Sequence, residues 1–389
     1  MKKLEIPDWV KEEHRKYFAS KVLTEIDKKV DNLAEGTKEK DFWKACQKNW
    51  QILAIGEPQQ LREIQKCVGK KYDAVIAPEE TGESGSEEGQ TAGKKKSSFC
   101  EAVKKVFGYK GFCQNEPEAW GAYRFTKEMG LRTCPYCNQN YTLVIVGEIE
   151  EEAKTEEEAK TEVGAKVEAG AKTGAEAEAE KAETKEEGER TEEEAKKNAE
   201  KKKKICRPNI DHFYPQNQYP YFSLSLYNMV PCCEMCNLRL KGAQEVKIEF
   251  PNPYEFDMDE EFRFKFQLDG ETTMSMVPLR NGKDTIFDQY NEMLHLEALY
   301  DEHQDYARKI YDRFQKYGRG YFDSLQNLLS KEESDKEESN KEEKTSKKVE
   351  FSEAEMRDLR WSQIPTKDEI LDEPFGKMRK DLIGQLEDL

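Results

Sequence analysis

The chain has 389 residues, of which 37% are charged and 36% hydrophobic, and its formal net charge at pH 7 is −17. The length allows two or three domains, but the hydrophobic share is too small for the whole chain to be packed core. The negative balance excludes a protein held on nucleic acid by its overall charge alone. No apolar segment follows Met1, and no run approaches the roughly 18 apolar residues of a membrane span, so we expect a cytoplasmic protein without a signal peptide.

Three low-complexity stretches carry more than half of the net negative charge. They are residues 78–98, 148–204 and 331–349. None has enough large apolar side chains to bury a core of its own. We therefore predict a flexible loop in the first, an acidic insertion in the second and a charged linker in the third. The insertion is expected to be a solvated spacer; docking of a partner or DNA mimicry is the alternative.

The N-terminal third of the sequence has the apolar periodicity of helices. Apolar residues recur at helical spacing over residues 9–53 and again over 99–130. A β-type run at 141–146 then precedes the acidic insertion, and a second run at 205–210 follows it. We predict an α-helical N-terminal region over 1–130 and a hairpin of the two β-type runs with the insertion at its tip, because loop-closure entropy grows only slowly with length.

The C-terminal third predicts a hairpin followed by helices. Residues 262–268 alternate strictly between apolar and polar side chains, and an Asp-Gly turn signal follows them. Helical spacing resumes over 285–330, and the tail from Glu353 has Trp361 as its apolar anchor. We therefore predict a hairpin plus an α-helical region over 251–389.

Two Cys-x-x-Cys pairs predict a metal centre. The first is Cys134 and Cys137, the second is Cys233 and Cys236, and 95 residues lie between Cys137 and Cys233. Each such turn directs two thiolates at one tetrahedral ion, and four thiolates leave no open coordination position, so we predict a structural zinc. Redox dithiols or unrelated buried thiols are the alternative. Cys232 is out of step with this spacing and is left out of the predicted ligand set.

A second group of polar residues has the chemistry of phosphodiester hydrolysis, which needs a base and a cation. Asp211 and His212 are adjacent at the end of a predicted strand, and Asn237 begins a predicted helix. Neutral imidazole suits a base near pH 7, and the Asp and Asn oxygens suit magnesium or manganese. Asn228, on the returning segment, could hydrogen-bond the backbone that carries His212. A surface Asp–His pair beside a zinc site is the alternative.

Further charged side chains lie close to these residues in the sequence. Arg239 and Lys241 follow Asn237 on the same predicted helix and either contact phosphates or form a solvated face. His295 and His303 are about 80° apart around a helix axis, so shared metal ligation is not expected and we treat both as structural.

The order Asp-His, Asn and Cys-x-x-Cys-Asn resembles the ββα-metal core of HNH endonucleases, many of which carry two zinc knuckles. In that family the His is the general base, the preceding Asp and the last His or Asn bind the catalytic metal, and the middle Asn orients the base. The resemblance implies these roles for His212, for Asp211 with Asn237, and for Asn228. It also implies an α+β fold, with an HNH core over 131–250 in a mainly helical chain. Asn at the last position resembles the HNH domain of RNA-guided nucleases and fits magnesium or manganese better than zinc.

Three motifs extend the resemblance to the HNH subunit of Septu-type anti-phage systems. They are Cys-Pro-Tyr-Cys-Asn, Asp-His-Phe-Tyr-Pro and Val-Pro-Cys-Cys-Glu-Met-Cys-Asn. The resemblance implies an endonuclease of antiviral defence that leaves 5′-phosphate ends, on DNA more than RNA, with a partner ATPase. The sequence has no G-x-x-x-x-G-K-[S/T] phosphate loop, so that ATPase would be a separate chain. A non-catalytic zinc-stapled nucleic-acid-binding module and a stand-alone restriction or homing-type HNH nuclease are the alternatives.

Overall fold

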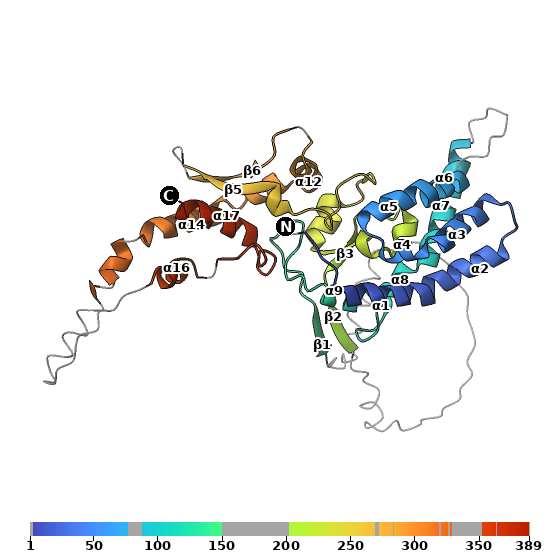
Figure 1. Ribbon diagram of the computed structural model, residues 1–389, viewed down its shortest axis with the longest axis horizontal. Coiled ribbons are helices and arrows are strands. Elements are labelled where there is room, and N and C mark those ends of the chain that lie inside the picture. Colours follow the sequence, from blue (N-terminus) through green and yellow to red (C-terminus); the bar gives the residue numbers. More distant parts are fainter. Residues whose placement is uncertain are drawn as a thin grey trace, which may run out of the picture. The chain divides into compact units, whose positions relative to one another are not determined.

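The computed structural model describes residues 3–76, 88–149, 202–268, 272–282, 284–318, 320–325, 327–328, 352–362 and 364–388 (Figure 1). Contacts group Met1–Val144 with Arg207–Leu389 in one compact unit and Ile145–Cys206 in a second. These ranges are mostly helical and contain three small antiparallel sheets, which agrees with the predicted α+β class. None of their helices is long and apolar enough to cross a membrane.

The first unit begins with a series of helices. They are α1 (Asp8–Phe18), η1 (Ala19–Leu23), α2 (Thr24–Asn32), α3 (Lys38–Lys48), α4 (Trp50–Ile55), α5 (Pro58–Ile64), η2 (Gln65–Gly69), α6 (Lys70–Ile76), α7 (Glu88–Phe107), α8 (Tyr109–Gln114) and α9 (Ala122–Glu128). The prediction of helices in this part of the chain is confirmed. Helix α7 begins inside the segment predicted as a loop, 78–98, because its Gln, Ala and Lys residues are good helix formers. Residues 78–87 of that segment lie outside the described ranges.

Aromatic rings form the core of the N-terminal helices. Phe42 and Trp43 of α3 meet with ring centroids 4.8 Å apart, and Tyr72 of α6 lies 5.7 Å from Phe99 of α7. Tyr72 also contacts Tyr221, at 5.6 Å, which belongs to the short helix η3 (Pro220–Phe222). Such edge-to-face and offset pairs add to the free energy of apolar burial. The N-terminal helices therefore pack directly on η3, a segment more than 140 positions beyond α6 along the chain.

The second unit is a hairpin of β1 (Ile145–Ile149) and β2 (Lys202–Cys206), with Ile145 opposite Cys206. The predicted pairing is present, but the strands are shifted from the predicted runs at 141–146 and 205–210. Pro208 has no N–H to donate to a ladder, and it lies between β2 and the next strand. Most of the predicted acidic insertion, residues 150–201, lies outside the described ranges.

Two strands and a helix follow in the order strand, strand, helix. Strand β3 (Asn209–His212) pairs antiparallel with β4 (Met229–Cys232), so that His212 lies opposite Met229. The connection contains η3 and a second 3₁₀ helix, η4 (Leu226–Asn228), and the helix after β4 is η5 (Met235–Lys241), a π-helical segment. The position of His212 at the end of β3 agrees with the predicted strand end.

The C-terminal part contains the third sheet and further helices. They are η6 (Met258–Glu260), β5 (Phe262–Gln267), β6 (Thr273–Pro278), α12 (Ile286–Leu294), α13 (Leu296–Asp301), α14 (Gln304–Lys316), α16 (Glu353–Trp361) and α17 (Gly376–Glu387). The predicted strand is confirmed over Phe262–Gln267 with its three phenylalanines buried, whereas Leu268 follows the strand and is exposed; Trp361 is buried as expected of an anchor. The Asp-Gly turn at 269–270 and the charged linker at 331–349 lie outside the described ranges.

Two glutamine side chains cover the edges of the β5–β6 hairpin. Gln304 of α14 accepts a hydrogen bond from the backbone N–H of Met274 at 2.7 Å and donates to its carbonyl at 2.8 Å. Gln385 of α17 makes the same pair of bonds with Phe266, at 2.7 and 3.3 Å. An unpaired strand edge invites association with other chains, and each amide here takes the place of one strand residue. The two-stranded sheet is therefore bounded by helices on both edges.

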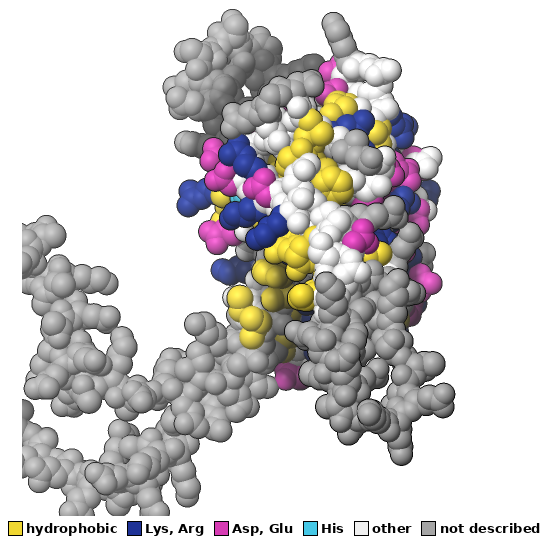
Figure 2. Space-filling model, turned by 90° about the vertical axis from the view of Figure 1, so that its left-hand side faces the viewer, with side chains coloured by type: hydrophobic (Ala, Val, Ile, Leu, Met, Phe, Trp, Pro, Cys, Tyr) yellow, Lys and Arg dark blue, Asp and Glu magenta, His cyan; other side chains and the backbone are white. Residues whose placement is uncertain are grey.

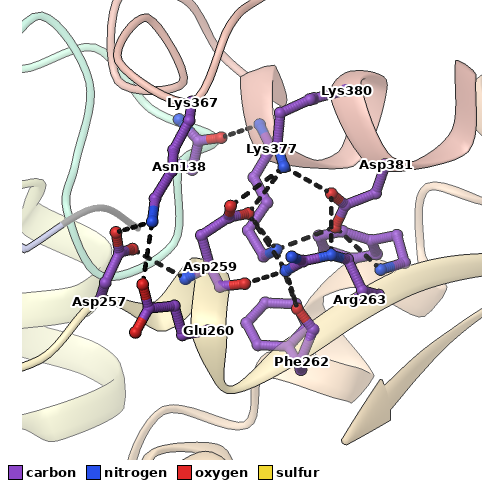
Figure 3. Close-up of polar contacts among 11 residues, drawn as sticks. Asn138, Asp257, Asp259, Glu260, Phe262, Arg263, Lys367, Lys377, Lys380 and Asp381 are labelled. Carbon is purple, nitrogen blue, oxygen red and sulfur yellow. Dashed lines mark hydrogen bonds and ion pairs between the residues drawn. The ribbon is translucent and has the colours of Figure 1, made fainter. Parts of the chain in front are cut away.

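Buried charges join α17 to the start of β5 (Figure 3). The ammonium of Lys377 lies 2.9 Å from carboxylate oxygens of both Asp259 and Asp381, and Lys380 adds a contact of 2.9 Å to Asp259. Burial opposes ionisation of Asp259, but the two ammonium groups bring its pKa down to about 2. The backbone N–H of Lys377 donates to the side chain of Asn138 at 3.0 Å, so this network also reaches the first Cys-x-x-Cys turn.

His14 makes the stability of the N-terminal packing depend on pH. Its Nε2 donates to the carbonyl of Leu224 at 2.8 Å, and its Nδ1 accepts from Trp120 at 3.2 Å, so both nitrogens are engaged in the neutral ring. Burial lowers the pKa of His14 to about 4, below its ordinary 6.5. The unfolded chain therefore binds a proton at a pH where the folded chain does not. The stabilisation is present above pH 6.5 and is lost as the pH falls toward 4.

We expect the contribution of His14 to the free energy of unfolding to fall by about 2 kcal/mol between pH 7 and pH 5. Urea denaturation at both pH values measures it. His14→Gln, which keeps a donor but does not titrate, should lose less stability over this interval than wild type. His295→Asn, at an exposed position, should behave as wild type, and an unchanged pH dependence in His14→Gln would contradict the assignment.

Candidate functional site

Four cysteine side chains meet in one buried cluster. The Sγ atoms of Cys134, Cys137, Cys233 and Cys236 all lie within 4.8 Å of one another, and those of Cys137 and Cys233 are 3.9 Å apart. Four thiolates at about 2.3 Å from one zinc would be about 3.8 Å apart, so the cluster fits a single tetrahedral ion. The predicted ligand set therefore comes together, and the four residues can bind a metal such as zinc.

Hydrogen bonds among the four thiols raise the pKa of Cys236 and lower that of Cys137. Burial raises the pKa of the Cys134 thiol, whereas hydrogen bonds from the neighbouring thiols lower the pKa of Cys233. The Sγ of Cys233 also accepts from the backbone N–H of Cys236 at 3.4 Å and from the Asn140 side chain at 3.5 Å. Backbone and amide donors to sulfur stabilise negative charge there. Cys232 is buried but is not part of the cluster, and none of the ten cysteines forms a disulfide.

The first Cys-x-x-Cys turn is anchored to the C-terminal part of the chain. Asn138, with a positive φ of 52°, donates to the carbonyl of Ile370 at 2.7 Å and to Thr133 Oγ1 at 3.0 Å. The hydroxyl of Tyr300 donates to the carbonyl of Cys137 at 2.7 Å. A short polar side chain tolerates this left-handed conformation, and its amide satisfies buried carbonyls that water cannot reach. The turn is thus fixed by residues more than 160 positions further along the chain.

Asp211 lies on β3 and is almost fully buried. Its Oδ2 accepts from the hydroxyl of Tyr136 at 2.7 Å, and its Oδ1 accepts from the ammonium of Lys241 at 2.8 Å. Burial raises the pKa of Tyr136 well above its ordinary value, so its hydroxyl keeps its proton and acts as the donor. An ionised carboxylate has about four acceptor sites, and these two bonds leave room for a further ligand.

His212, the next residue, is oriented by a backbone carbonyl. Its Nε2 lies 2.9 Å from the carbonyl oxygen of Ser223, and the Gln216 amide also contacts Nε2, at 2.9 Å. Because a carbonyl only accepts, the Ser223 contact requires the hydrogen on Nε2 and the lone pair on Nδ1, and the Gln216 amide then turns its oxygen rather than its NH2 toward Nε2. The ring of Tyr109 packs edge to face on the imidazole, with centroids 4.3 Å apart. Burial lowers the pKa of His212 to about 4, so the imidazole is neutral at pH 7.

Asn228 braces the backbone that follows His212. Its Oδ1 accepts from the N–H of Tyr214 at 2.7 Å, and its amide donates to the carbonyls of Tyr214 and Phe222 at 3.1 and 3.0 Å. Its own carbonyl accepts from the N–H of Phe213 at 2.9 Å. The side chain is fully buried, and all its hydrogen-bonding groups serve the connection between β3 and β4.

Asn237 lies on η5 and faces the same cavity as Asp211 and His212. The cavity has a volume of about 680 Å³, and Gln216, Asn217, Gln218 and Lys241 are among its other lining residues. Asn237 is partly exposed. Three of the four residues to which sequence reasoning assigned catalysis therefore line one cavity, and Asn228 is not among its lining residues.

The two basic residues expected to contact phosphates have different surroundings. Arg239 is exposed on η5. Lys241 is 1% exposed; its ammonium bonds Asp211 and, at 2.9 Å, the carbonyl of His212. The solvated alternative for Lys241 is therefore wrong, because its ammonium is the buried counter-charge of the Asp211 carboxylate, and phosphate contact by Lys241, which lines the cavity, stays a prediction.

The remaining two histidines lie away from this cavity. His295 is exposed, with a left-handed backbone between α12 and α13. His303 contacts the Gln139 side chain at 3.3 Å and packs against Phe375, with ring centroids 4.7 Å apart. Neither is a lining residue of the cavity. Sequence reasoning missed Tyr136 altogether, although it stands between two predicted ligands in Cys-Pro-Tyr-Cys.

Comparison with known proteins finds no match to a family model, a curated protein or a solved structure. The chemistry of the site therefore has to be argued from its own residues.

Removal of one cysteine ligand should release the metal. We expect Cys236→Ser to bind no zinc and to lose folding stability with it, because structural zinc contributes directly to the free energy of folding. Cys232→Ser is the matched control: it replaces a buried neighbouring cysteine outside the cluster and should keep one zinc per chain. Metal analysis and thermal unfolding of both proteins measure these effects. Full zinc content in Cys236→Ser would rule out the four-cysteine centre.

Loss of Lys241 should destabilise the fold. We expect Lys241→Met to cost about 3–5 kcal/mol, because it leaves the buried Asp211 carboxylate without its counter-charge. Arg239→Met, at an exposed position on the same helix, should change stability by less than about 0.5 kcal/mol. Urea denaturation of the zinc-loaded proteins separates the two. Equal stability of both variants would show that Lys241 is not a buried counter-charge that the Asp211 carboxylate needs.

Proposed function

We propose that the chain is a metal-dependent nuclease of the HNH type that hydrolyses phosphodiester bonds of nucleic acid, DNA in preference to RNA. The observation that carries the proposal is the shared cavity: Asp211 and His212 from the end of β3 and Asn237 from η5 line it. The strand, strand, helix order with a four-cysteine cluster at its base supports the same reading.

His212 is the proposed general base. The bond from Nε2 to the Ser223 carbonyl leaves Nδ1 with a lone pair that can accept a proton from water, and the burial that lowers the pKa of the ring to about 4 keeps it neutral but makes it a weaker base than free imidazole. Asn228 is the proposed positioning residue, since its bonds to Tyr214 fix the backbone immediately after the base. Fixing the base in one orientation lowers the entropic cost of the reaction.

Asp211 and Asn237 would hold the catalytic magnesium or manganese. A carboxylate oxygen and an amide oxygen are the hard ligands such ions take, and the carboxylate keeps acceptor sites beside its bonds to Tyr136 and Lys241. When bound, the ion would neutralise charge that develops on the phosphate and the leaving oxygen. In the four-cysteine cluster the ion would be structural, because four thiolates leave no open position.

The net negative charge of the chain affects how it would associate with a nucleic-acid substrate. On the face shown in Figure 2, the coloured basic and acidic side chains are interspersed rather than gathered into one basic patch. A net charge of −17 repels nucleic acid at long range. We therefore favour a defence effector that acts with a partner, of which a separate ATPase chain is the candidate, over a nuclease that acts alone.

One observation favours a second function, a non-catalytic zinc-stapled nucleic-acid-binding module. Lys241 occupies one oxygen of Asp211, the carboxylate that the catalytic ion needs. If this pair persists whenever a divalent ion is offered, the site cannot support hydrolysis. Such a module would bind nucleic acid and cut none with any metal.

Substitution of the proposed base tests the nuclease function. We expect His212→Ala to lower the rate of plasmid nicking in magnesium or manganese by about 10²–10⁴-fold, with zinc content unchanged. His295→Asn is the control, since Asn tolerates the left-handed backbone there and the residue lies off the cavity. Equal nicking by wild type and His212→Ala would refute the role of the base. If zinc-loaded wild type cuts neither DNA nor RNA with candidate ATPases present, the nuclease function is refuted and the non-catalytic nucleic-acid-binding module is the remaining candidate.

A further inference from the structure

One side chain connects the four-cysteine cluster to the candidate catalytic carboxylate. Tyr136 stands between Cys134 and Cys137, and its hydroxyl donates to Asp211 Oδ2 at 2.7 Å. Tyr136 is 2% exposed and Asp211 3%, so water does not compete for this bond. A hydrogen bond between a neutral donor and a buried carboxylate is stronger than its solvent-exposed counterpart.

The position of the Tyr136 hydroxyl depends on the first Cys-x-x-Cys turn. The residue is covalently flanked by two of the four ligands, and the turn that carries it is held by the backbone bond from Asn138 to the carbonyl of Cys134, at 2.8 Å. Tyr300 holds the carbonyl of Cys137. These bonds hold the turn that carries the hydroxyl, and an ion bound by the two flanking thiolates would restrain the same turn further.

We propose that Tyr136 is a positioning residue that fixes the metal-binding orientation of Asp211 and so couples the four-cysteine centre to the catalytic metal site. The inference rests on the proposed function, because it takes Asp211 as a ligand of the catalytic ion. Tyr136 itself touches neither that ion nor the substrate.

The two partners of Asp211 have different consequences for a metal. Lys241 neutralises Oδ1 and competes with any cation, whereas Tyr136 is uncharged and restrains Oδ2 without competing electrostatically. Without the hydroxyl, Oδ2 is buried with no donor and the carboxylate is free to turn fully toward Lys241. Hydrogen-bond partners of metal ligands typically account for about 10–100-fold in metal affinity.

The test measures manganese binding directly, without any assay of cutting. Mn²⁺ is titrated into the zinc-loaded full-length protein and the free ion is followed by electron paramagnetic resonance. We expect Tyr136→Phe to bind Mn²⁺ about 10–100-fold more weakly than wild type, with its zinc retained. Tyr254→Phe is the matched control: this buried tyrosine donates to the carbonyl of Met229 at 2.7 Å, on the strand paired with β3, and its loss should leave Mn²⁺ affinity within about twofold.

Each other outcome overturns the inference in a recognisable way. Equal Mn²⁺ affinity of wild type and Tyr136→Phe, with Asp211→Asn binding weakly, removes the role of Tyr136 and leaves the proposed nuclease site standing. Equal Mn²⁺ affinity of wild type and Asp211→Asn contradicts both the role of Tyr136 and the proposed catalytic metal site, since Asp211 is then no metal ligand. Loss of zinc or of the folded state in Tyr136→Phe shows that the hydroxyl supports the fold rather than the carboxylate's orientation. Equal weakening in Tyr254→Phe means that any lost buried hydrogen bond has this effect.

Discussion

Contact among four thiols is the constraint on which the rest of the site depends. Cys134 and Cys137 are brought to Cys233 and Cys236 from far along the chain, and all four sulfurs lie within 4.8 Å of one another. Thiolates at this separation repel one another, and a metal ion bound among them would offset that repulsion. The first turn is itself fixed by Asn138 and Tyr300 on the C-terminal side, and it carries Tyr136 to Asp211.

Buried charge is the second organising feature. The Asp211–Lys241 pair and the Lys377 network are both nearly inaccessible to water. Burying such groups costs solvation free energy that their attraction only partly offsets, so their contribution to net stability is small while the loss of one partner is costly. Pairs of this kind accept few alternative arrangements. The first pair holds η5 against β3, two elements that line the cavity, and the second network holds α17 against the start of β5.

Sequence reasoning was most successful where the chemistry is local. A Cys-x-x-Cys turn directs two ligands to one point whatever surrounds it, so the cluster could be predicted from spacing alone. The partner of Lys241 could not, because it depends on which face of η5 lies against β3. Asn237 and Lys241 are four positions apart and share a helix face, so an inward Asn237 requires an inward Lys241. The contact of Tyr136 with Asp211 could not be predicted for the same reason. The Cys-x-x-Cys spacing identifies the ligands but not what the residue between them contacts.

The N-terminal helices also belong to the site, although no predicted catalytic residue comes from them. His14 donates to the carbonyl of Leu224, and His212 donates to the carbonyl of Ser223. Ser223 is the residue immediately before Leu224. Ser225 Oγ adds a bond of 2.6 Å to the carbonyl of Leu53. Three consecutive residues of one buried segment are thus held from two sides. Since the Ser223 carbonyl selects which nitrogen of His212 carries the hydrogen, α1 and α4 help to fix the tautomer of the proposed base, and a rigid helical region upstream is a physical requirement of the site rather than a separate module.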